Sequence, residues 1–455
     1  MSTVTFTAIG GGSEIGANSY AIAVDNQTIL LDCGMHPKKE GLEALPEFGI
    51  LRKSPEAVIV SHAHIDHCGA VPYLLKEHPS AFCYATQPTV NIMDRMLHNS
   101  VSVMTTMAIE RGISEYPLYG HADVDYAIRR SYGLAYEQEF ELGPSSPFRA
   151  SLHHSGHVLG GACILLNAAG HTLFYTGDVC MSHQELMGGL TLLDESITVD
   201  TLIIESTRGT HENGHTISFE AEVERFGEEI RKVLERGGSV LVPSFALGRT
   251  QELLNIISRL QESGMVPDAP VYASGLGRAV YEVYNKYSHY LRPDKTLRPL
   301  CEYRRIGDVW ERDVRRQLLD SPGIIVATSG MMIENTPSSL IAMEMAAHTH
   351  HGIFFVGYLD PDTLGYKLLR AEKGDRLTFE LKGPQVPVRL ENRQSFSFSA
   401  HATREDLCKL VDHVTPKNII FVHGDADAIS WMHENTASVF RKHVPAIGRP
   451  IELKD

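Results

Sequence analysis

Apolar and polar positions alternate in two different ways along the chain. In the N-terminal part, short apolar runs such as Val4–Ile9 and Ser19–Val24 follow one another with only turns between them, which predicts sheet-forming strands. From about residue 208, helical and strand patterns alternate strictly, beginning with a helix predicted over 219–236 and a strand over 240–243. Such alternation is typical of a parallel sheet covered by helices, so we expect a second domain in this part.

Several individual elements follow from the same patterns. A long helix is predicted from Thr89 to about Gly112, and its methionines are interpreted as core packing. Shorter helices are predicted over 123–132 and 307–319, and a strand over 395–399.

The composition describes a folded globular protein. The chain has 455 residues, too many for one ordinary domain, and its hydrophobic and charged fractions are 43% and 21%. No apolar run approaches the roughly 20 residues of a membrane-spanning helix, so no membrane partner is expected. Seven scattered cysteines without a Cys-x-x-Cys pair, and an N-terminus without signal-peptide features, predict a cytoplasmic protein with free thiols.

The net charge is the weakest guide to the substrate. Its value of −15 argues mildly against a nucleic-acid partner, because phosphate binding relies on lysine and arginine. Bound divalent metal ions would reverse that sign locally. The bulk charge therefore leaves the substrate class open.

The densest group of chemically active side chains follows a strand predicted over 57–60. Four potential metal ligands stand within six residues: His62, His64, Asp66 and His67. Imidazoles combined with a carboxylate suit zinc or a similar borderline metal better than calcium or magnesium. The alternative is a histidine-rich surface turn or a helix cap. The density of ligand-type side chains favours the metal site. These side chains follow the carboxyl end of a strand, which is where α/β folds place their catalytic and binding residues.

Further carboxylates and histidines end other predicted strands. His157 lies in a second histidine cluster, and Asp178 follows the next strand. Following the first cluster in this order, they complete a ligand set for two metals. Asp32, also at a strand end, either orients a ligand imidazole or only forms a turn. The loop Gly10–Gly16 allows close approach of an anion to the backbone, but hairpin turns use the same residues.

The order of these motifs resembles the metallo-β-lactamase fold. Glu205 in Ile-Ile-Glu-Ser-Thr, His401 in Ser-Phe-Ser-Ala-His and His423 in Phe-Val-His-Gly resemble the three motifs of the β-CASP nucleases. The run Leu31–Pro37 is similar to the endonuclease subunit of the eukaryotic cleavage-and-polyadenylation factor. The run Ser13–Asn18 is loosely similar to RNase J.

The resemblance implies an α/β fold: a metallo-β-lactamase αββα sandwich with an inserted β-CASP α/β domain. The sandwich would comprise residues 1–207 and 396–455, and the β-CASP domain residues 208–395. Many relatives carry tyrosine after Glu-Ser-Thr, whereas this chain has Arg208, a difference that bears on substrate contacts.

The resemblance also implies roles for individual residues. One zinc ion would bind to His62, His64 and His157. A second would bind to Asp66, His67 and His423. Asp178 would bridge the two ions, with Mn²⁺ as the alternative metal.

The catalytic residues implied in the same way are His401, as the acid that protonates the leaving group, Glu205, which orients it, Asp66 and Asp32. Candidate phosphate contacts are Ser244, Arg249, Ser329 and Ser399. For these four, ordinary loop and capping roles are equally expected.

The activity implied by the resemblance is that of a zinc-dependent ribonuclease, acting in RNA processing or decay. Two cations roughly 3.5–4 Å apart would share a hydroxide that attacks the phosphodiester and leaves a 5′-phosphate and a 3′-hydroxyl. Single-stranded RNA would have to thread between the two domains. The histidine at position 423 is typical of RNA-processing members of the family, whereas DNA-repair members generally carry valine.

Other functions stay open at this point. They are a β-CASP DNA nuclease, a metallohydrolase acting on a non-nucleic-acid ester, and a catalytically dead scaffold. The scaffold is disfavoured because every ligand position is filled. The sequence leaves open endonuclease versus 5′-exonuclease cleavage, the RNA target, and whether the chain forms a homodimer.

Overall fold

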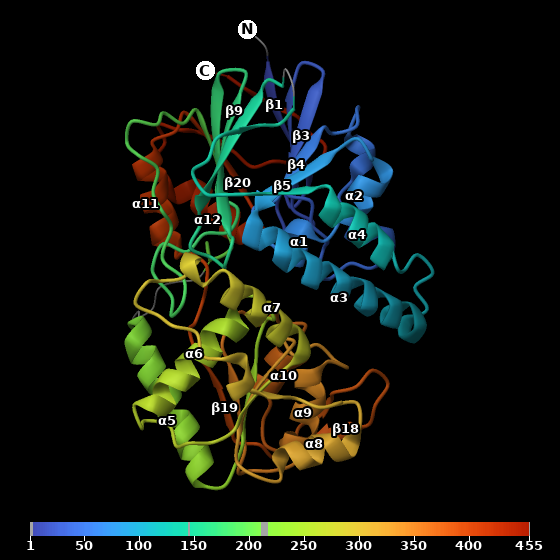
Figure 1. Ribbon diagram of the computed structural model, residues 1–455, viewed down its shortest axis with the longest axis vertical. Helices are drawn as coiled ribbons and strands as arrows, with labels where there is room; N and C mark the ends of the chain where they lie inside the picture. Colours follow the sequence, from blue (N-terminus) through green and yellow to red (C-terminus); the bar gives the residue numbers. More distant parts are fainter. Residues whose placement is uncertain (1–2, 144–145, 211–216, 455) are drawn as a thin grey trace. The chain divides into compact units, whose positions relative to one another are not determined.

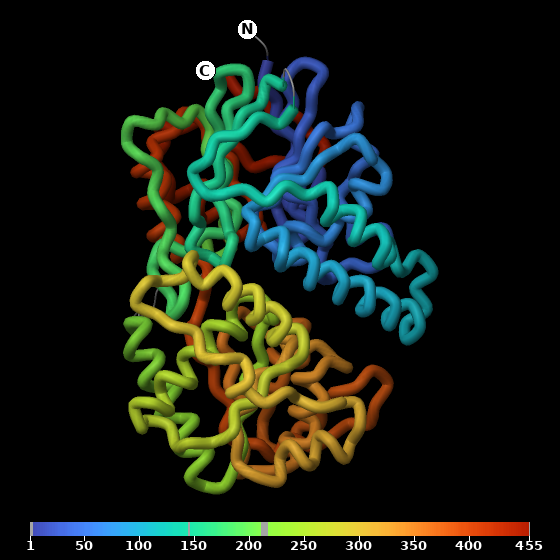
Figure 2. Tube along the Cα trace, viewed as in Figure 1, coloured from blue at the N-terminus to red at the C-terminus, as the bar shows by residue number. Residues whose placement is uncertain are grey.

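The computed structural model describes residues 3–143, 146–210 and 217–454, which form two compact units (Figure 1). Unit 1 comprises Met1–His183, Met187–Asn213 and His401–Asp455, and unit 2 comprises Gln184–Leu186 and Gly214–Ala400. The chain therefore leaves unit 1 and returns to it, so that the C-terminal segment, red in Figure 2, joins the unit built by the N-terminal segment.

The change from unit 1 to unit 2 after residue 213 lies within 211–216, outside the described residues, so the predicted boundary at 207/208 stays a prediction. Among the described residues, no helix has the length and apolar character needed to cross a membrane.

Unit 1 contains two seven-stranded sheets. The first sheet has, in spatial order, β22 (Ile451–Leu453), β1 (Val4–Gly10), β2 (Ser19–Val24), β3 (Gln27–Leu31), β4 (Ala57–Ile59), β5 (Phe82–Thr86) and β6 (Ser131–Leu134). The second has β21 (Arg441–His443), β20 (Asn418–Val422), β11 (Thr201–Glu205), β10 (His171–Tyr175), β9 (Ala162–Ala168), β8 (Phe148–His154) and β7 (Phe140–Glu141). Both sheets are mixed. In the first, β1, β2 and β3 pair antiparallel, whereas β3, β4 and β5 pair parallel. In the second, β8, β9 and β10 pair antiparallel, whereas β10, β11 and β20 pair parallel.

The two sheets of unit 1 enclose one apolar core. Phe6 and Tyr20 of the first sheet pack in the same cluster as Leu152 and Ile164 of the second. Helices α11 (Arg404–Val414) and α12 (Ala426–Asn435) cover the other face of the second sheet. Helices α1 (Ile65–Cys68), α2 (Val71–Glu77), α3 (Gln87–Arg111) and α4 (His121–Arg129) belong to the first sheet's side (Figure 1). The predicted αββα sandwich is confirmed.

Unit 2 is built on a six-stranded sheet in which every pair is parallel. Its spatial order is β14 (Arg304–Arg305), β13 (Val271–Ala273), β15 (Ile324–Ala327), β12 (Val240–Pro243), β16 (Gly352–Phe355) and β19 (Asn392–Ser395). Side chains alternate along β12: Val240 and Val242 join one apolar cluster and Leu241 joins the other. Both faces of the sheet are therefore buried, as in other parallel sheets.

Helices cover both faces of the unit 2 sheet. One face carries α5 (Phe219–Glu235), α6 (Arg249–Glu262) and α7 (Gly275–Lys286). The other carries α8 (Arg312–Leu319), α9 (Pro337–Ala346) and α10 (Leu364–Arg370). The remaining described elements are the hairpin β17 (Arg376–Thr378) and β18 (Gln385–Pro387) and the 3₁₀ turns η1 (Gly41–Ala44), η2 (Phe48–Ile50), η3 (Ser288–Tyr290) and η4 (Leu300–Glu302). The predicted parallel sheet with flanking helices is confirmed.

Three predicted elements differ from the structure. The strand predicted over 395–399 ends at Ser395, and the alternating phenylalanines that follow it pack against Phe226 of α5 with ring centroids 5.0 and 5.5 Å apart. The helix predicted over 307–319 begins only at Arg312, because the Asp308 side chain accepts a hydrogen bond from the Trp310 amide and forms a turn. The helix predicted over 123–132 ends at Arg129, and β6 follows it.

The segment after β3 holds the histidine-rich turn in place. Cys33 N donates to His67 O at 2.8 Å, and Met35 N donates to Ile65 O at 2.9 Å. Gly34 lies between these two bonds, and a Cβ atom there would stand only 1.7 Å from Asp66 O. A glycine is therefore required at this position by close approach of two backbones, although its own φ angle is ordinary.

Replacing Gly34 by alanine is expected to displace the turn that carries Asp66 and His67. Because the obstructing atom belongs to the backbone, we expect a destabilisation at the upper end of the usual range of about 0.5–3 kcal/mol. Gly49→Ala is the matched control, since nothing lies within 4 Å of its added Cβ and its effect should stay within about 0.5 kcal/mol. Chemical denaturation of both variants measures the difference, and equal stabilities would contradict this account.

Candidate metal centre

The candidate ligands of unit 1 come from loops at strand ends. The histidine-rich turn follows β4, and Asp178 follows β10. His157 comes from the loop between β8 and β9, and His423 comes directly after β20. The seven residues predicted as metal ligands thus belong to four different segments, and the structure brings all of them into one cluster: His62, His64, Asp66, His67, His157, Asp178 and His423.

Three imidazoles converge in the first group. The Nδ1 atom of His64 lies 2.9 Å from Nε2 of His62 and 3.2 Å from Nε2 of His157. Burial and then the neighbouring His67 lower the pKa of His62 well below its ordinary value, and burial also lowers the pKa of His64. The rings of His62 and His64 are therefore neutral near pH 7, which is the form in which imidazole binds metals.

Asp66, His67 and His423 form the second group. The Oδ2 atom of Asp66 lies 3.6 Å from Nε2 of His67 and 3.3 Å from Nε2 of His423. The two histidine rings are 4.9 Å apart between centroids.

Asp178 stands between the two groups and gives one oxygen to each. Its Oδ2 lies 3.6 Å from Nε2 of His62 and 3.6 Å from Nε2 of His157. Its Oδ1 lies 3.5 Å from Nε2 of His67 and 3.3 Å from Nδ1 of His423. Among the described residues, this buried Oδ1 has no hydrogen-bond partner. A buried carboxylate oxygen surrounded by imidazole nitrogens at these distances fits a pair of cations on either side of the carboxylate.

The shifted pKa values of the cluster indicate that its carboxylates favour a positive charge beside them. Burial alone would lower the pKa of His67, but Asp178, Asp66 and Asp32 outweigh it and hold that pKa well above its ordinary value. Burial alone would raise the pKa of Asp178, but His423 and His67 hold that pKa well below its ordinary value. The carboxylate of Asp178 is therefore ionised, and such a buried charge needs a proton or a metal ion beside it.

Asp32 contacts the ring of His67. Its Oδ2 lies 2.7 Å from His67 Nδ1, which leaves Nε2 of that ring facing the cluster. The same carboxylate accepts hydrogen bonds from the Ser61 amide at 2.6 Å, the Ser61 hydroxyl at 2.8 Å and the Tyr175 hydroxyl at 2.6 Å. Asp32 therefore contacts a candidate ligand, and the role in which it orients that imidazole stays a prediction.

The backbone around the cluster is strained at two of these residues. Asp32 has a φ of 60° and His423 a φ of 51°, both in the left-handed region that disfavours side chains other than glycine. Such strain is typical of functional sites, where surrounding contacts hold a residue in a costly conformation.

Sequence reasoning missed three residues that contact the candidate site. Tyr175 binds Asp32, and Thr207 Oγ1 lies 2.9 Å from Nδ1 of His423. Asn18, fully buried, donates from Nδ2 to Asp66 O at 3.0 Å and lies 3.2 Å from Nε2 of His67. Tyr175 is the last residue of β10, and Thr207 stands two residues after the end of β11. Nothing in the sequence indicates their partners. Asn18 ends a run that is loosely similar to RNase J, but that similarity indicates no contact with the histidine-rich turn.

His401 and Glu205 form a pair beside the cluster. Nδ1 of His401 lies 3.3 Å from Oε2 of Glu205, whose other oxygen accepts a hydrogen bond from the Val179 amide at 2.7 Å. Glu205 is buried, whereas the His401 side chain is 24% exposed and its ring lies 4.6 Å from that of His157. Burial alone would lower the pKa of His401, but Glu205 and then Asp178 hold it above its ordinary value.

The four candidate phosphate contacts all belong to unit 2. Ser244 is buried and its hydroxyl lies 2.8 Å from that of Thr250, while Ser329 Oγ accepts from the Ile333 amide at 3.0 Å. The buried guanidinium of Arg249 donates to Phe398 O at 2.7 Å and also binds Gln184. These contacts fit loop and capping roles, and phosphate binding by these residues and Ser399 stays a prediction.

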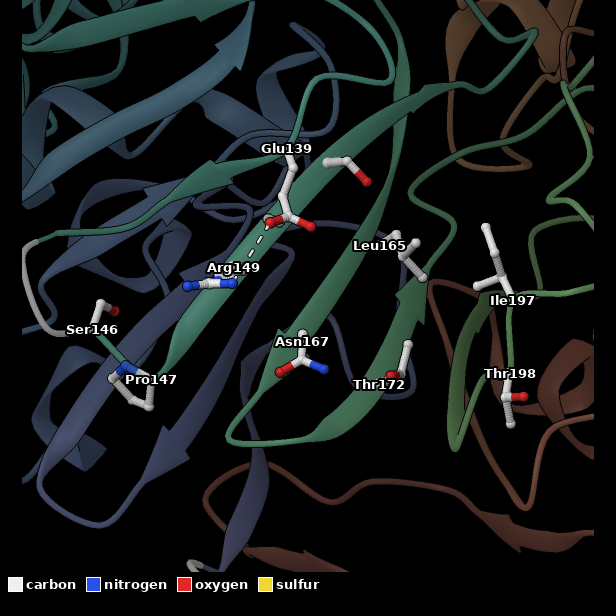
Figure 3. Close-up of a pocket in the computed structure, with 11 residues that line it drawn as sticks. Glu139, Ser146, Pro147, Arg149, Leu165, Asn167, Thr172, Ile197 and Thr198 are labelled. Atoms are coloured by element: carbon white, nitrogen blue, oxygen red, sulfur yellow. Dashed lines mark ion pairs between the residues drawn. The ribbon is translucent and has the colours of Figure 1, made fainter.

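A separate hollow of about 530 Å³ lies over β8, β9 and β10 (Figure 3). Its lining includes Arg149, which is paired with Glu139 at 3.9 Å, and the polar side chains of Asn167 and Thr172. None of the clustered histidines or carboxylates lines it. The metal-ligand chemistry is thus concentrated at the strand ends and not in this hollow.

Family profiles match three consecutive parts of the chain. The profile described as "Metallo-beta-lactamase superfamily" matches residues 12–231, "Beta-Casp domain" matches residues 250–368, and "Zn-dependent metallo-hydrolase RNA specificity domain" matches residues 385–444. The third of these segments contains both His401 and His423.

Whole-chain relatives agree with the profiles. The chain is 30% identical over 421 residues to an RNase J-like protein of Methanocaldococcus jannaschii, covering 91% of each. It is 30% identical over 453 residues to "Transcription termination factor FttA" of the same organism, covering 95% of this chain and 69% of that protein. To "Cleavage and polyadenylation specificity factor 73" of Drosophila melanogaster it is 29% identical over 430 residues, but it spans only 60% of that protein's length.

A solved structure supports the fold. It is described as "Crystal Structure of a Protein of Unknown Function from Enterococcus faecalis V583" and has a TM-score of 0.59 at 15% identity, with 99% of this chain and 100% of that chain covered. Taken together with the profiles and the relatives, these likenesses show that the chain belongs to the β-CASP family of the metallo-β-lactamase superfamily, with a Zn-dependent metallo-hydrolase RNA specificity domain.

Proposed function

We propose that the protein is a zinc-dependent ribonuclease that hydrolyses phosphodiester bonds of single-stranded RNA and leaves a 5′-phosphate and a 3′-hydroxyl. The observation that carries this proposal is the division of Asp178 between two groups of ligand-type side chains, with one carboxylate oxygen directed at each. A site of this kind suits in-line displacement at phosphorus, which two metal ions catalyse in many nucleases.

The residues of the cluster would hold two zinc ions. His62, His64 and His157 would bind the first, and the second would bind to Asp66, His67 and His423, with Asp178 shared between them. A carboxylate oxygen of Glu205 also lies within 4.8 Å of the ligand atoms of Asp178 and His423. The two oxygens of Glu205, however, already contact the Val179 amide and the His401 ring. When bound, the metal ions supply Lewis acidity, which activates a water nucleophile and stabilises charge developing on the phosphate.

His401 would give a proton to the departing 3′-oxygen. Its Nδ1 is turned toward Glu205, so the opposite ring nitrogen, Nε2, is the one that would face a substrate. Glu205 holds the ring in this orientation and favours its protonated form, while the Val179 amide holds Glu205. Asp32 would act indirectly, through its contact with Nδ1 of His67, which keeps Nε2 of that ring directed at the cluster.

RNA is favoured over DNA as the substrate by the family evidence. The chain matches a profile whose description contains "RNA specificity domain", and a relative that it covers almost completely is described as RNase J-like. A DNA nuclease or a hydrolase of another ester would keep the same metal cluster, so the substrate class is a separate proposal from the metal site. Cytoplasmic location and assembly as a homodimer likewise stay predictions.

Cleavage of RNA in preference to DNA tests this function directly. Purified zinc-loaded protein is incubated with end-labelled single-stranded RNA and with DNA of the same sequence, at matched salt because phosphate contacts depend on ionic strength. We expect faster cleavage of RNA, with products that carry a 5′-phosphate. DNA cleaved as fast as RNA would refute the ribonuclease assignment and leave the metal site untouched, and the ladder of products would show whether cleavage is internal or starts at the 5′ end.

Removal of the metal ions is expected to abolish activity and to weaken the fold. The carboxylates of Asp178, which is buried, and Asp66, which is partly buried, would lose their counter-ions. Ligand linkage predicts a loss of about 2.7 kcal/mol per site if free zinc had exceeded its Kd about a hundredfold. Thermal unfolding and RNA cleavage are measured before chelation, after it, and after zinc is restored. A stripped protein that keeps its full activity would exclude this site as the catalytic centre.

Substitution of His401 separates proton transfer from metal binding. His401→Ala should retain both metal ions and lower the cleavage rate by roughly 10²–10⁴-fold, which is the usual contribution of a positioned acid. Glu205→Gln should be milder, because it preserves the shape of the side chain and removes only its charge. The metal content of each variant is measured alongside its rate, and loss of metal from His401→Ala would make His401 a ligand instead.

A further inference from the structure

A second group of metal-ligating side chains lies on the surface of unit 1, between helices α3 and α4. Helix α3 contributes Asp94 and His98, and helix α4 contributes His121 and Asp125. In each helix the two residues are four positions apart, so that they lie on the same face. The two helices pack against each other (Figure 1), which brings the two pairs together.

The two imidazoles meet through their nitrogens. Nδ1 of His98 lies 2.7 Å from Nδ1 of His121, the ring centroids are 5.0 Å apart and the ring planes differ by 21°. So short a contact at that centroid separation requires both nitrogens to lie between the centroids, nearly in the planes of the rings. The rings therefore meet edge to edge, with two potential ligand atoms directed at one point.

The carboxylates of Asp94 and Asp125 lie near the other ring nitrogen of His98, on the side away from His121. Its Nε2 lies 3.5 Å from Oδ1 of Asp94 and 3.3 Å from Oδ1 of Asp125. Carboxylates at this nitrogen favour the tautomer that carries its proton on Nε2, which leaves the lone pair of Nδ1 facing His121. Histidines that bind metals commonly donate their other N–H to a carboxylate in this way.

The group is open to solvent. The side chains of His98, Asp94 and Asp125 are 32%, 34% and 54% exposed, and His121 is also exposed. An ion could therefore reach the two nitrogens and complete its coordination with water. None of these residues belongs to the cluster at the strand ends.

We propose that His98 and His121 form a surface site for a borderline divalent metal ion such as Zn²⁺, which would tie α3 to α4 through the two nitrogens that now contact each other directly. Two imidazole nitrogens suit zinc and neighbouring transition metals and exclude Ca²⁺ and Mg²⁺, which prefer oxygen ligands. The nitrogens would separate slightly on binding, which rotation of two exposed side chains allows. With only two protein ligands, the site should bind zinc more weakly than the candidate centre.

The test is a calorimetric titration of zinc into zinc-loaded protein that has been dialysed free of excess metal. Wild type should take up one further equivalent, and His98→Ala/His121→Ala should take up none. His348→Ala/His350→Ala is the matched control, since it removes another exposed histidine pair whose rings lie 5.6 Å apart and whose planes differ by 65°. This control should behave as wild type. A wild type that binds no further zinc, or a double variant that binds as much as wild type, would overturn the proposal.

Two additional readouts exclude a merely structural role. Cu²⁺ added to the zinc-loaded protein should give an electron paramagnetic resonance spectrum with two nitrogen ligands, and this signal should be missing from the His98→Ala/His121→Ala protein. Asp125→Asn should keep the site but weaken zinc binding by roughly 10–100-fold, the usual effect of losing such a carboxylate partner. Unchanged zinc affinity in Asp125→Asn, or a spectrum without nitrogen ligands, would contradict the assigned geometry.

Discussion

The need to neutralise buried carboxylates governs the structure of unit 1. Asp32 and Asp178 are almost inaccessible to solvent, and Asp66 lies between two histidine rings beside them. Ionised groups in such places are costly unless opposite charge stands next to them. The imidazoles and the buried Oδ1 of Asp178, which has no hydrogen-bond partner in the described part of the chain, are arranged so that cations would meet this need. Bound metal ions would then stabilise the fold as well as take part in the proposed chemistry.

The fold provides this arrangement by bringing many strand ends to one place. The turn after β4 and the residue after β10 come from different sheets of the sandwich, and β20 adds His423 from the C-terminal segment. The site is therefore incomplete until the chain has passed through unit 2 and returned. Close backbone contact at Gly34 and left-handed backbone at Asp32 and His423 show how tightly the loops are constrained.

Much of this could be predicted from the sequence, and the reasons are physical. The ligand turn is local, with four ligand types in six residues after a buried strand, and the parallel sheet of unit 2 follows from strict alternation of strands and helices. The assignment of Asp178, Glu205 and His423 to one site depended on resemblance to a family, because they are far apart in the chain and individually ordinary.

Other features could not be predicted, because they depend on contacts between distant segments. The bond from Tyr175 to Asp32 and the approach of Asn18 to His67 have no local signature. The predicted strand over 395–399 is wrong because its alternating phenylalanines serve packing against α5 and not sheet pairing. The pair of His98 and His121 likewise appears only when α3 and α4 are packed together.

The central claim is that the cluster holds two metal ions with Asp178 between them. The most direct measurement is the anomalous X-ray scattering of crystals of the zinc-loaded protein, recorded on both sides of the zinc absorption edge. The account predicts two peaks in the cluster, one among His62, His64 and His157 and the other among Asp66, His67 and His423. A single peak bound by residues of both groups, or no peak within the cluster, would contradict it.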